Sequence, residues 1–140
     1  MTTQTELKSN PDTLTRGVVP YIQVENAAKA IAFYQRAFGA KELARTASGD
    51  GKQIMNCQLE INGGLIMVMD AMPEHGFAFQ HSHSVTMQLM VPDGQAWFDR
   101  AVEAGCKVTT PFQKMFWGDM WGALIDPFQI QWGIDEPAAK

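Results

Sequence analysis

The feature that most constrains the fold is a repeat: one strand, one helix and the residues that bound the helix occur twice in this chain. Apolar residues recur at helical spacing over residues 27–38 and again over residues 94–104. The bounding residues are of similar type: Asn26 and Gly39 bound the first helix, Asp93 and Gly105 the second. When the two helix starts are aligned, the glycines match within one residue. Half of a 140-residue chain is too short to close a core alone. The repeat therefore predicts two similar units that pack as one domain.

Runs of β-branched, aliphatic and aromatic residues between turn residues predict the strands of each unit. The predicted strands are 18–24, 40–47, 53–61 and 64–69 in the first unit, and 85–91, 106–110, 114–117, 121–126 and 129–134 in the second. The intervening segment 71–83 has no periodicity and carries Pro and Gly, which predicts a linker. The order of elements, written twice, predicts an α+β fold of two βαβββ units.

Charge and composition limit the partners that this protein is expected to have. The formal net charge is −4, and Lys and Arg form no cluster. We therefore expect neither nucleic acid nor a membrane surface as a partner. No apolar run approaches the ~20 residues that cross a bilayer. Residues 1–16 are polar and lack the apolar segment of a signal peptide, so we expect a disordered or loosely packed tail on a cytoplasmic protein.

The two cysteines, Cys57 and Cys106, lie far apart and form no CxxC motif. Cys57 falls within a predicted strand, and Cys106 directly follows a predicted helix. Neither has the nearby base or helix N-terminus that activates a thiol. We interpret both as reduced, unreactive thiols of a cytoplasmic protein.

Two groups of phrases carry a family resemblance. The first is Val19-Pro20-Tyr21-Ile22-Gln23-Val24 with Ala30-Ile31-Ala32-Phe33-Tyr34 and Ala37-Phe38-Gly39-Ala40; the second is Phe116-Trp117-Gly118-Asp119 with Asp126-Pro127-Phe128 and Trp132. With the βαβββ repeat, they resemble the vicinal oxygen chelate superfamily, and in particular its PhnB-like branch. This superfamily includes glyoxalase I, extradiol dioxygenases, and the fosfomycin and bleomycin resistance proteins.

The resemblance covers residues 17–135 and implies a single domain with module one at about 17–70 and module two at about 84–135. It implies a curved mixed sheet around a ligand cavity, the glyoxalase/bleomycin resistance-like fold. It also implies a homodimer, because many relatives are dimers. It does not fix an activity, since one such scaffold hosts many unrelated functions.

Metal-dependent members of this superfamily hold a divalent ion with His, Glu or Gln on the concave face of the sheet. The resemblance places the ligand positions of this chain at Val19, Thr86 and Gly133. None of these has a side chain suited to Zn, Mn or Fe. Asn56 and Gln58 stand where the PhnB-like branch often carries His and Glu. We therefore predict no catalytic metal.

The three histidines, His75, His81 and His83, lie in or beside the linker. We interpret them as solvent-facing loop residues. The alternative is weak metal binding by His81 and His83, whose imidazoles share one side of an extended segment.

A period of two assigns residues to the two faces of the sheet. The apolar residues of strand 53–61 are expected to face the helices, which leaves Asn56, Gln58 and Glu60 toward the cavity. The candidate ligand-binding residues on this wall are Tyr21, Gln23, Asn56, Gln58, Thr86, Gln88 and Gln131. Amides donate and accept hydrogen bonds without titrating, so this wall suits a neutral or zwitterionic polar ligand. The alternative is that these amides satisfy one another and water on an exposed sheet face.

The stretch from residue 112 to residue 134 holds three of the four tryptophans. Phe116, Trp117 and Trp121, with Phe112, are predicted to form an aromatic rim of the cavity, because small-molecule pockets usually combine such walls with a few polar groups. Trp132 and Phe33 are predicted to be core residues, and Asp119 and Asp126 turn residues.

Three functions are compatible with these features. The first is a protein that binds a small polar or aromatic molecule in its cavity without a catalytic metal. The second is a lyase, isomerase or dioxygenase with a divalent metal on atypical ligands such as Gln58, Glu60, Gln131 or the histidines. The third is a structural or regulatory dimer without a ligand.

Overall fold

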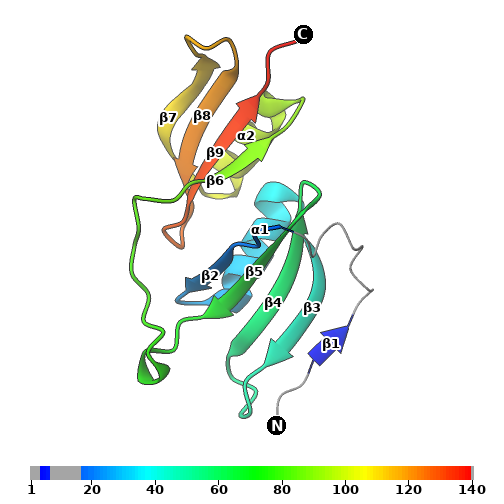
Figure 1. The fold of residues 1–140 in the computed structure, drawn as a ribbon, viewed down its shortest axis with the longest axis vertical. Coiled ribbons are helices and arrows are strands. Elements are labelled where there is room, and N and C mark those ends of the chain that lie inside the picture. The colour runs from blue at the N-terminus through cyan, green and yellow to red at the C-terminus, as the bar shows by residue number, and fades with distance from the viewer. Residues whose placement is uncertain (1–3, 7–16, 140) are drawn as a thin grey trace. The chain divides into compact units, whose positions relative to one another are not determined.

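The computed structural model describes residues 4–6 and 17–139, which form two compact units (Figure 1). Within the predicted tail it describes β1 (Gln4–Glu6), which pairs antiparallel with a strand of the first unit. The rest of residues 1–16 lies outside the described residues, so the loose packing of the tail stays a prediction. No helix in the described part of the chain is both long enough and apolar enough to cross a membrane.

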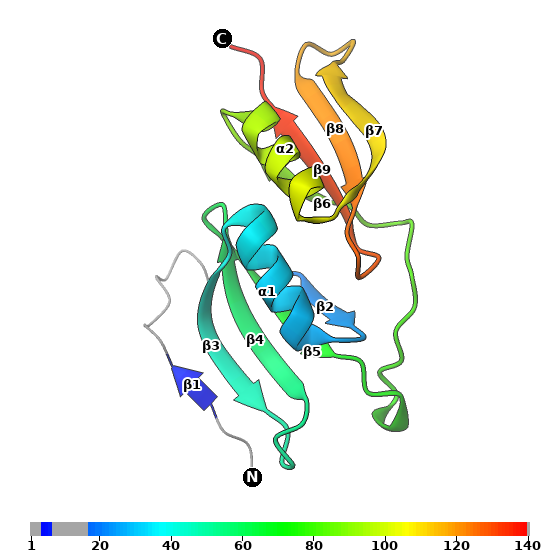
Figure 2. The same cartoon turned by 180° about the vertical axis from the view of Figure 1, so that it is seen from behind.

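The first module contains β2 (Tyr21–Val24), α1 (Ala27–Phe38), β3 (Lys41–Ala47), β4 (Ile54–Ile61) and β5 (Gly64–Asp70). With β1 at its edge, the sheet has the order β1-β3-β4-β5-β2. The edge strand β2 runs parallel to β5, and the other pairs are antiparallel. The helix α1 lies against one face of this sheet, as Figure 2 shows from behind.

The second module contains β6 (Met87–Met90), α2 (Gly94–Ala104), β7 (Lys107–Lys114), β8 (Met120–Ile125) and β9 (Gln131–Glu136). Its sheet has the order β6-β9-β8-β7, and β6 runs parallel to β9. Each module is thus a strand, a helix and three further strands, which confirms the predicted α+β class and the repeat. Both helices begin and end at the predicted residues.

Burial alternates along the strands as the sequence period predicts. On β4, Cys57 and Leu59 are fully buried beneath the helix-covered face, whereas Asn56 and Gln58 are half-buried on the other face. On β6, Met87 and Leu89 are buried, and Gln88 and Met90 are exposed. Phe33 and Trp132 are core residues, as predicted. Each fully buried side chain of this size contributes roughly 1.5–3 kcal/mol of apolar burial.

The helix N-termini are held by acidic or amide side chains in both modules. The Asn26 carboxamide accepts from Lys29 N at 3.1 Å, which confirms it as the N-cap. A strand-end carboxylate reinforces each helix: Asp70 Oδ1 accepts from Ala27 N, and Glu136 Oε1 accepts from Gly94 N, both at 2.8 Å. The predicted N-cap Asp93 makes no side-chain capping bond. Since an acidic group at a helix N-terminus satisfies free N–H groups and complements the helix dipole, Glu136 takes that role.

Several predicted strands have other bounds in the structure. The predicted strand 114–117 is mostly a turn, in which Met115 N donates to Asp119 O and Gly118 N donates to Met115 O. Residues 107–114 form one strand with irregular pairing, because the register shifts twice along β7. The predicted strand 18–24 begins only at Tyr21.

The segment 71–83, predicted as a linker without regular structure, contains a short helix and a β-bridge at its N-terminal end. Met72 and Phe77 exchange both backbone hydrogen bonds and close an isolated antiparallel bridge around the short 3-10 helix η2 (Pro73–His75). Gly76, in a left-handed conformation that favours glycine, ends that helix. We call residues 72–77 the bridge loop.

Candidate functional site

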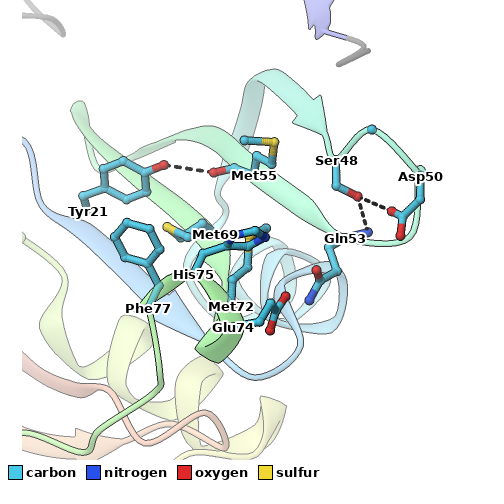
Figure 3. A pocket seen from close by; sticks show the side chains of 11 residues that line it. Tyr21, Ser48, Asp50, Gln53, Met55, Met69, Met72, Glu74, His75 and Phe77 are labelled. Atoms are coloured by element: carbon cyan, nitrogen blue, oxygen red, sulfur yellow. Dashed lines mark hydrogen bonds between the residues drawn. The ribbon is translucent and has the colours of Figure 1, made fainter.

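The first module carries a pocket of about 730 Å³ against the sheet (Figure 3). Its lining comes from the strands β2, β4 and β5, from the β3–β4 turn, and from the bridge loop. The lining residues are Tyr21, Ser48, Gly49, Asp50, Gln53, Met55, Met69, Met72, Glu74, His75 and Phe77. This volume lies within the range of ~300–1,000 Å³ found for small-molecule sites, and most of the lining is apolar.

Methionines and aromatic rings make the apolar part of the pocket. Met69 on β5 and Met55 on β4 lie between Tyr21 on one side and the β3–β4 turn on the other, and Phe77 projects from the bridge loop (Figure 3). Methionine is unbranched and polarisable, so such a lining adapts to ligands of different shapes. Tyr21 and Phe77 are about half exposed, and a ligand that covers their rings would bury apolar surface.

Hydrogen bonds within the protein occupy both hydroxyl donors of the pocket and at most one N–H of its glutamine amide. Tyr21 Oη donates to Met55 O at 2.9 Å, and Ser48 Oγ donates to Asp50 Oδ1 at 2.6 Å. Gln53 Nε2 is 3.5 Å from Ala71 O, at the limit of a hydrogen bond. The Ser48 hydroxyl and then the backbone N–H of Lys52 lower the pKa of Asp50, so this carboxylate stays charged at neutral pH.

Of the predicted ligand-binding residues in the first module, Tyr21 lines the pocket. Gln23, Asn56 and Gln58 lie on the same sheet face, because Gln23 pairs with Met69 and Gln58 pairs with Met67. The Oε1 atom of Gln23 is buried and has no hydrogen-bond partner. Asn56 Nδ2 is 3.4 Å from the sulfur of Met67. The part of the sheet that lines the pocket therefore carries Met55 and Met69, and the predicted amides Gln23, Asn56 and Gln58 lie outside the lining.

The second module carries the remaining predicted site residues. Gln88 Oε1 accepts from Trp121 Nε1 at 3.2 Å. Phe116 and Trp117 lie in the turn after β7, with Phe116 almost fully exposed and Trp117 about half exposed. Thr86 is exposed just before β6, and the Gln131 amide donates to Val85 O at 3.0 Å. Whether these residues bind a ligand stays a prediction.

Phe112 does not belong to that aromatic group. Its ring lies 5.5 Å from the ring of Phe98 on α2. The Phe112 ring fills the space beside Gly94 at the start of the helix, and the Phe98 ring fills the space beside Gly122. Phe112 therefore packs beneath the helix, which corrects its prediction as a rim residue. The ring centroids of Trp117 are 5.0 Å from Phe116 and 6.2 Å from Trp121, so these three remain one cluster.

A pair of carboxyl groups lies beside this aromatic cluster. Asp135 is 4% exposed, pairs across the strands with Trp121, and has one carboxyl oxygen without a hydrogen-bond partner. Burial, followed by the hydrogen bond and the charge of Asp119, raises the pKa of Asp135 to about 6. Asp119 Oδ1 also accepts from Ala138 N. Sequence reasoning assigned Asp119 only to a turn and gave no weight to Asp135.

Asp126 is a structural residue, as its Asp-Pro context predicts. Its Oδ1 accepts from Phe128 N and Ile130 N at 2.8 and 3.0 Å, and its Oδ2 accepts from Trp132 Nε1 at 2.9 Å. The carboxylate thus ties the β8–β9 turn to the buried tryptophan. All three contacts are used to build the fold, so Asp126 is not a candidate for chemistry.

The positions that the resemblance assigns to a metal do not fit one. Val19 packs against the apolar pair Leu43 and Leu65. A side chain at Gly133 would overlap Gln88 Oε1 and come within 3.1 Å of Trp121 Nε1, so the hydrogen-bonded Gln88 and Trp121 already cover this position. No group of three or more His, Cys, Asp or Glu side chains in the described ranges is arranged to hold a metal.

The histidines are placed near the pocket and beyond it. His75 is exposed in the bridge loop and lines the pocket. The rings of His81 and His83 stand edge to face with centroids 4.2 Å apart, and His81 Nδ1 is 3.0 Å from Gln129 O. That contact occupies one of the two ring nitrogens of His81, which leaves the pair a weak candidate for a metal.

Both cysteines are buried, as predicted for structural thiols. Burial raises the pKa of Cys57 and that of Cys106 to about 12. A thiol of this pKa carries almost no thiolate at neutral pH, so neither cysteine is suited to be a nucleophile.

Comparisons with known proteins agree with this fold. The profile of the Glyoxalase/Bleomycin resistance protein/Dioxygenase superfamily matches residues 14–134, and the chain belongs to this family. It is 37% identical over 127 residues to the uncharacterized protein Mb0911c of Mycobacterium bovis, an alignment that covers 86% of this chain and 83% of the relative.

Two solved structures share the fold at low sequence identity. A PhnB protein from Bacillus cereus aligns with a TM-score of 0.67 at 15% identity, over 85% of this chain and 98% of that one. The fosfomycin resistance protein FosX from Listeria monocytogenes aligns with a TM-score of 0.68 at 13% identity, over 89% and 92% of the two chains. The predicted superfamily and the PhnB-like resemblance are thereby confirmed at the level of fold.

Proposed function

We propose that this protein binds a small organic molecule in the pocket of its first module, without a catalytic metal. The observation that carries the proposal is the combination of a cavity of about 730 Å³ with a lining of methionine and aromatic side chains and a few polar groups. Membership of a family that includes resistance proteins is compatible with a binding function and does not select it.

The pocket offers binding surface and little catalytic machinery. Its hydroxyl groups and one N–H of the Gln53 amide are engaged with protein acceptors, and no cysteine lines it. Its polar groups that could transfer a proton, Glu74 and His75, are exposed. Apolar burial against Met69 and Phe77 is therefore the main source of affinity that we expect.

A thermal-stability screen with a matched pair of variants tests the proposal. A ligand that binds only the folded chain must raise the melting temperature, by an amount that grows with its concentration. Met55→Trp, at an exposed position of the pocket, should abolish the rise by filling the cavity. Trp117→Ala, in the second module, should leave it unchanged.

The opposite pattern would reject the proposal. If Trp117→Ala abolished the rise and Met55→Trp preserved it, the aromatic cluster of the second module would be the site. The homodimer and the cytoplasmic location stay predictions; sedimentation velocity of the purified chain tests the first.

A further inference from the structure

We infer that the ligand of this pocket is an organic cation: an apolar or aromatic body that carries an amine or amidine group. This inference rests on the proposed function and adds the chemical class of the ligand. It comes from the balance of charges, donors and acceptors among the lining residues.

The charged groups of the lining are acidic. Asp50 in the β3–β4 turn and Glu74 in the bridge loop both line the pocket, and the lining contains no Lys or Arg. Both carboxylates are exposed, so they keep their hydration while the pocket is empty and need no buried partner. An anionic ligand would meet two like charges, whereas a cation would meet opposite ones.

The hydrogen-bonding groups point to the same class of ligand. The donors of Tyr21 and Ser48 are used inside the protein, and the amide of Gln53 faces a backbone carbonyl. The second oxygen of Asp50 and the carboxylate of Glu74 can still accept, because a carboxylate has about four acceptor sites and Asp50 Oδ1 alone takes the turn contacts. The donors that remain on the lining side chains are the second N–H of the Gln53 amide and the His75 ring. The free acceptors of the two carboxylates thus exceed the free side-chain donors, which favours a ligand that brings donors, as an ammonium or amidinium group does.

The apolar lining suits the body of such a cation. Tyr21 and Phe77 present half-exposed rings beside Met55 and Met69 (Figure 3). Aromatic faces attract a cation through the negative charge of the ring face, and the methionines accept an apolar body of variable shape. The apolar lining would thus contact the body of the ligand, and the carboxylates of Asp50 and Glu74 would contact its cationic group.

Calorimetric titration with fragments that share a carbon skeleton tests the inference on the full chain. The probes are 4-phenylbutylamine, 4-phenylbutan-1-ol and 4-phenylbutyrate, together with their naphthyl counterparts. We expect the amine of each set to bind tighter than the alcohol, and the carboxylate to bind weakest. Added salt should weaken the amine alone, because exposed ion pairs are screened.

Two variants that remove one charge each locate the effect. Glu74→Gln should weaken the amine by roughly three- to fivefold, the size expected for an exposed ion pair, and leave the alcohol unchanged. Glu25→Gln changes an exposed carboxylate of the same module outside the pocket lining, and it should change neither.

The outcomes separate the inference from the proposed function. If the alcohol or the carboxylate bound as tightly as the amine, and Met55→Trp abolished that binding, the cationic class would be overturned and the pocket would stand. If Glu74→Gln and Glu25→Gln weakened the amine equally, the inference would also be overturned, because the effect would then come from the net charge of the protein and not from a carboxylate in the pocket. No binding by any fragment would overturn the pocket itself and the inference with it.

Discussion

The two modules repeat one backbone and place different chemistry at equivalent positions. In the first module Tyr21 pairs with Met67 and Gln23 with Met69. In the second module the equivalent parallel pair aligns Gln88 with Gly133 and Met90 with Asp135. The face opposite the helix therefore presents methionines on β5 of one module, and a glycine and a buried carboxyl group on β9 of the other.

This exchange explains why the sheet face of the first module can hold the pocket. There Met69 lines the pocket, and the bridge loop after β5 folds back to form a wall. In the second module Gln88 and Trp121 bond across Gly133, and Asp119 faces Asp135. The two modules share the backbone, and the side chains on the face opposite the helix determine whether that face holds a pocket or is covered by its own residues.

Substitutions in the turn between the last two strands of each module are expected to give the largest difference in the free energy of unfolding. Asp126→Ala leaves Phe128 N, Ile130 N and Trp132 Nε1 without their acceptor, and should lower the free energy of unfolding by about 3–5 kcal/mol. Asn62→Ala, in the corresponding turn of the first module at φ 51°, should cost about 1–2 kcal/mol. Urea denaturation of both variants measures the two values, and equal losses would contradict the structural role of Asp126.

A dependence on pH is expected from the second module. The unfolded Asp135 carboxyl releases its proton near pH 3.8 and the folded one near pH 6, so the folded chain binds more protons between these values. Stability from this group is thus fully present below about pH 4 and is lost as the pH rises through about 6, on the order of 2–3 kcal/mol.

Asp135→Asn isolates this contribution. The variant should lack that part of the pH dependence and should melt above the wild type at pH 7.5. Met69→Leu, at the equivalent position of the first module, should keep the wild-type pH profile. Parallel profiles of wild type and Asp135→Asn between pH 4 and 7.5 would refute the raised pKa.

The closed face around Gly133 should show coupling between neighbours. Gly133→Ala places a Cβ against Gln88 Oε1 and should cost about 1 kcal/mol through the lost hydrogen bond to Trp121. In a Gln88→Ala background the same change should cost less, because the overlapping amide is gone. A double-mutant cycle from urea denaturation measures this difference, and additive costs would show that the amide does not fill the position.

One buried cysteine in each module allows their opening to be compared, with the smallest expected effect. Neither Cys57 nor Cys106 should react with a thiol reagent in the folded chain at pH 8, because both are buried and their pKa values are about 12. A ligand in the pocket should slow the residual labelling of Cys57 more than that of Cys106. Mass spectrometry of labelled peptides follows each site, and equal slowing would mean that the modules open together.

The sequence predicts the scaffold better than the site. Helical spacing and the cap residues suffice for both helices, and the period of two along β4 predicts which side chains face the helix. The register shifts in β3 and β7 are set by strand pairing, so residues 114–117 were misassigned. Pro73 and Gly76 could have indicated a compact turn, but the pairing of Met72 with Phe77 that makes the bridge loop a pocket wall is a tertiary contact.

Asp135 and the methionines that line the pocket are not among the predicted site residues, for a related reason. A lone Asp near the end of a strand resembles a solvated residue, and its burial depends on Asp119 and Trp121, which are distant in sequence. Methionine spacing alone does not distinguish a pocket lining from ordinary core.

The most direct test of the account is an NMR titration of the chain labelled with ¹³C in its methionine methyl groups. The chain has nine methionines; Met55, Met69 and Met72 line the pocket, whereas Met87, Met115 and Met120 lie in the second module. A ligand from the stability screen should shift the first three resonances and leave the second three in place. Shifts confined to Met87, Met115 and Met120 would contradict the central claim that the first module holds the binding site.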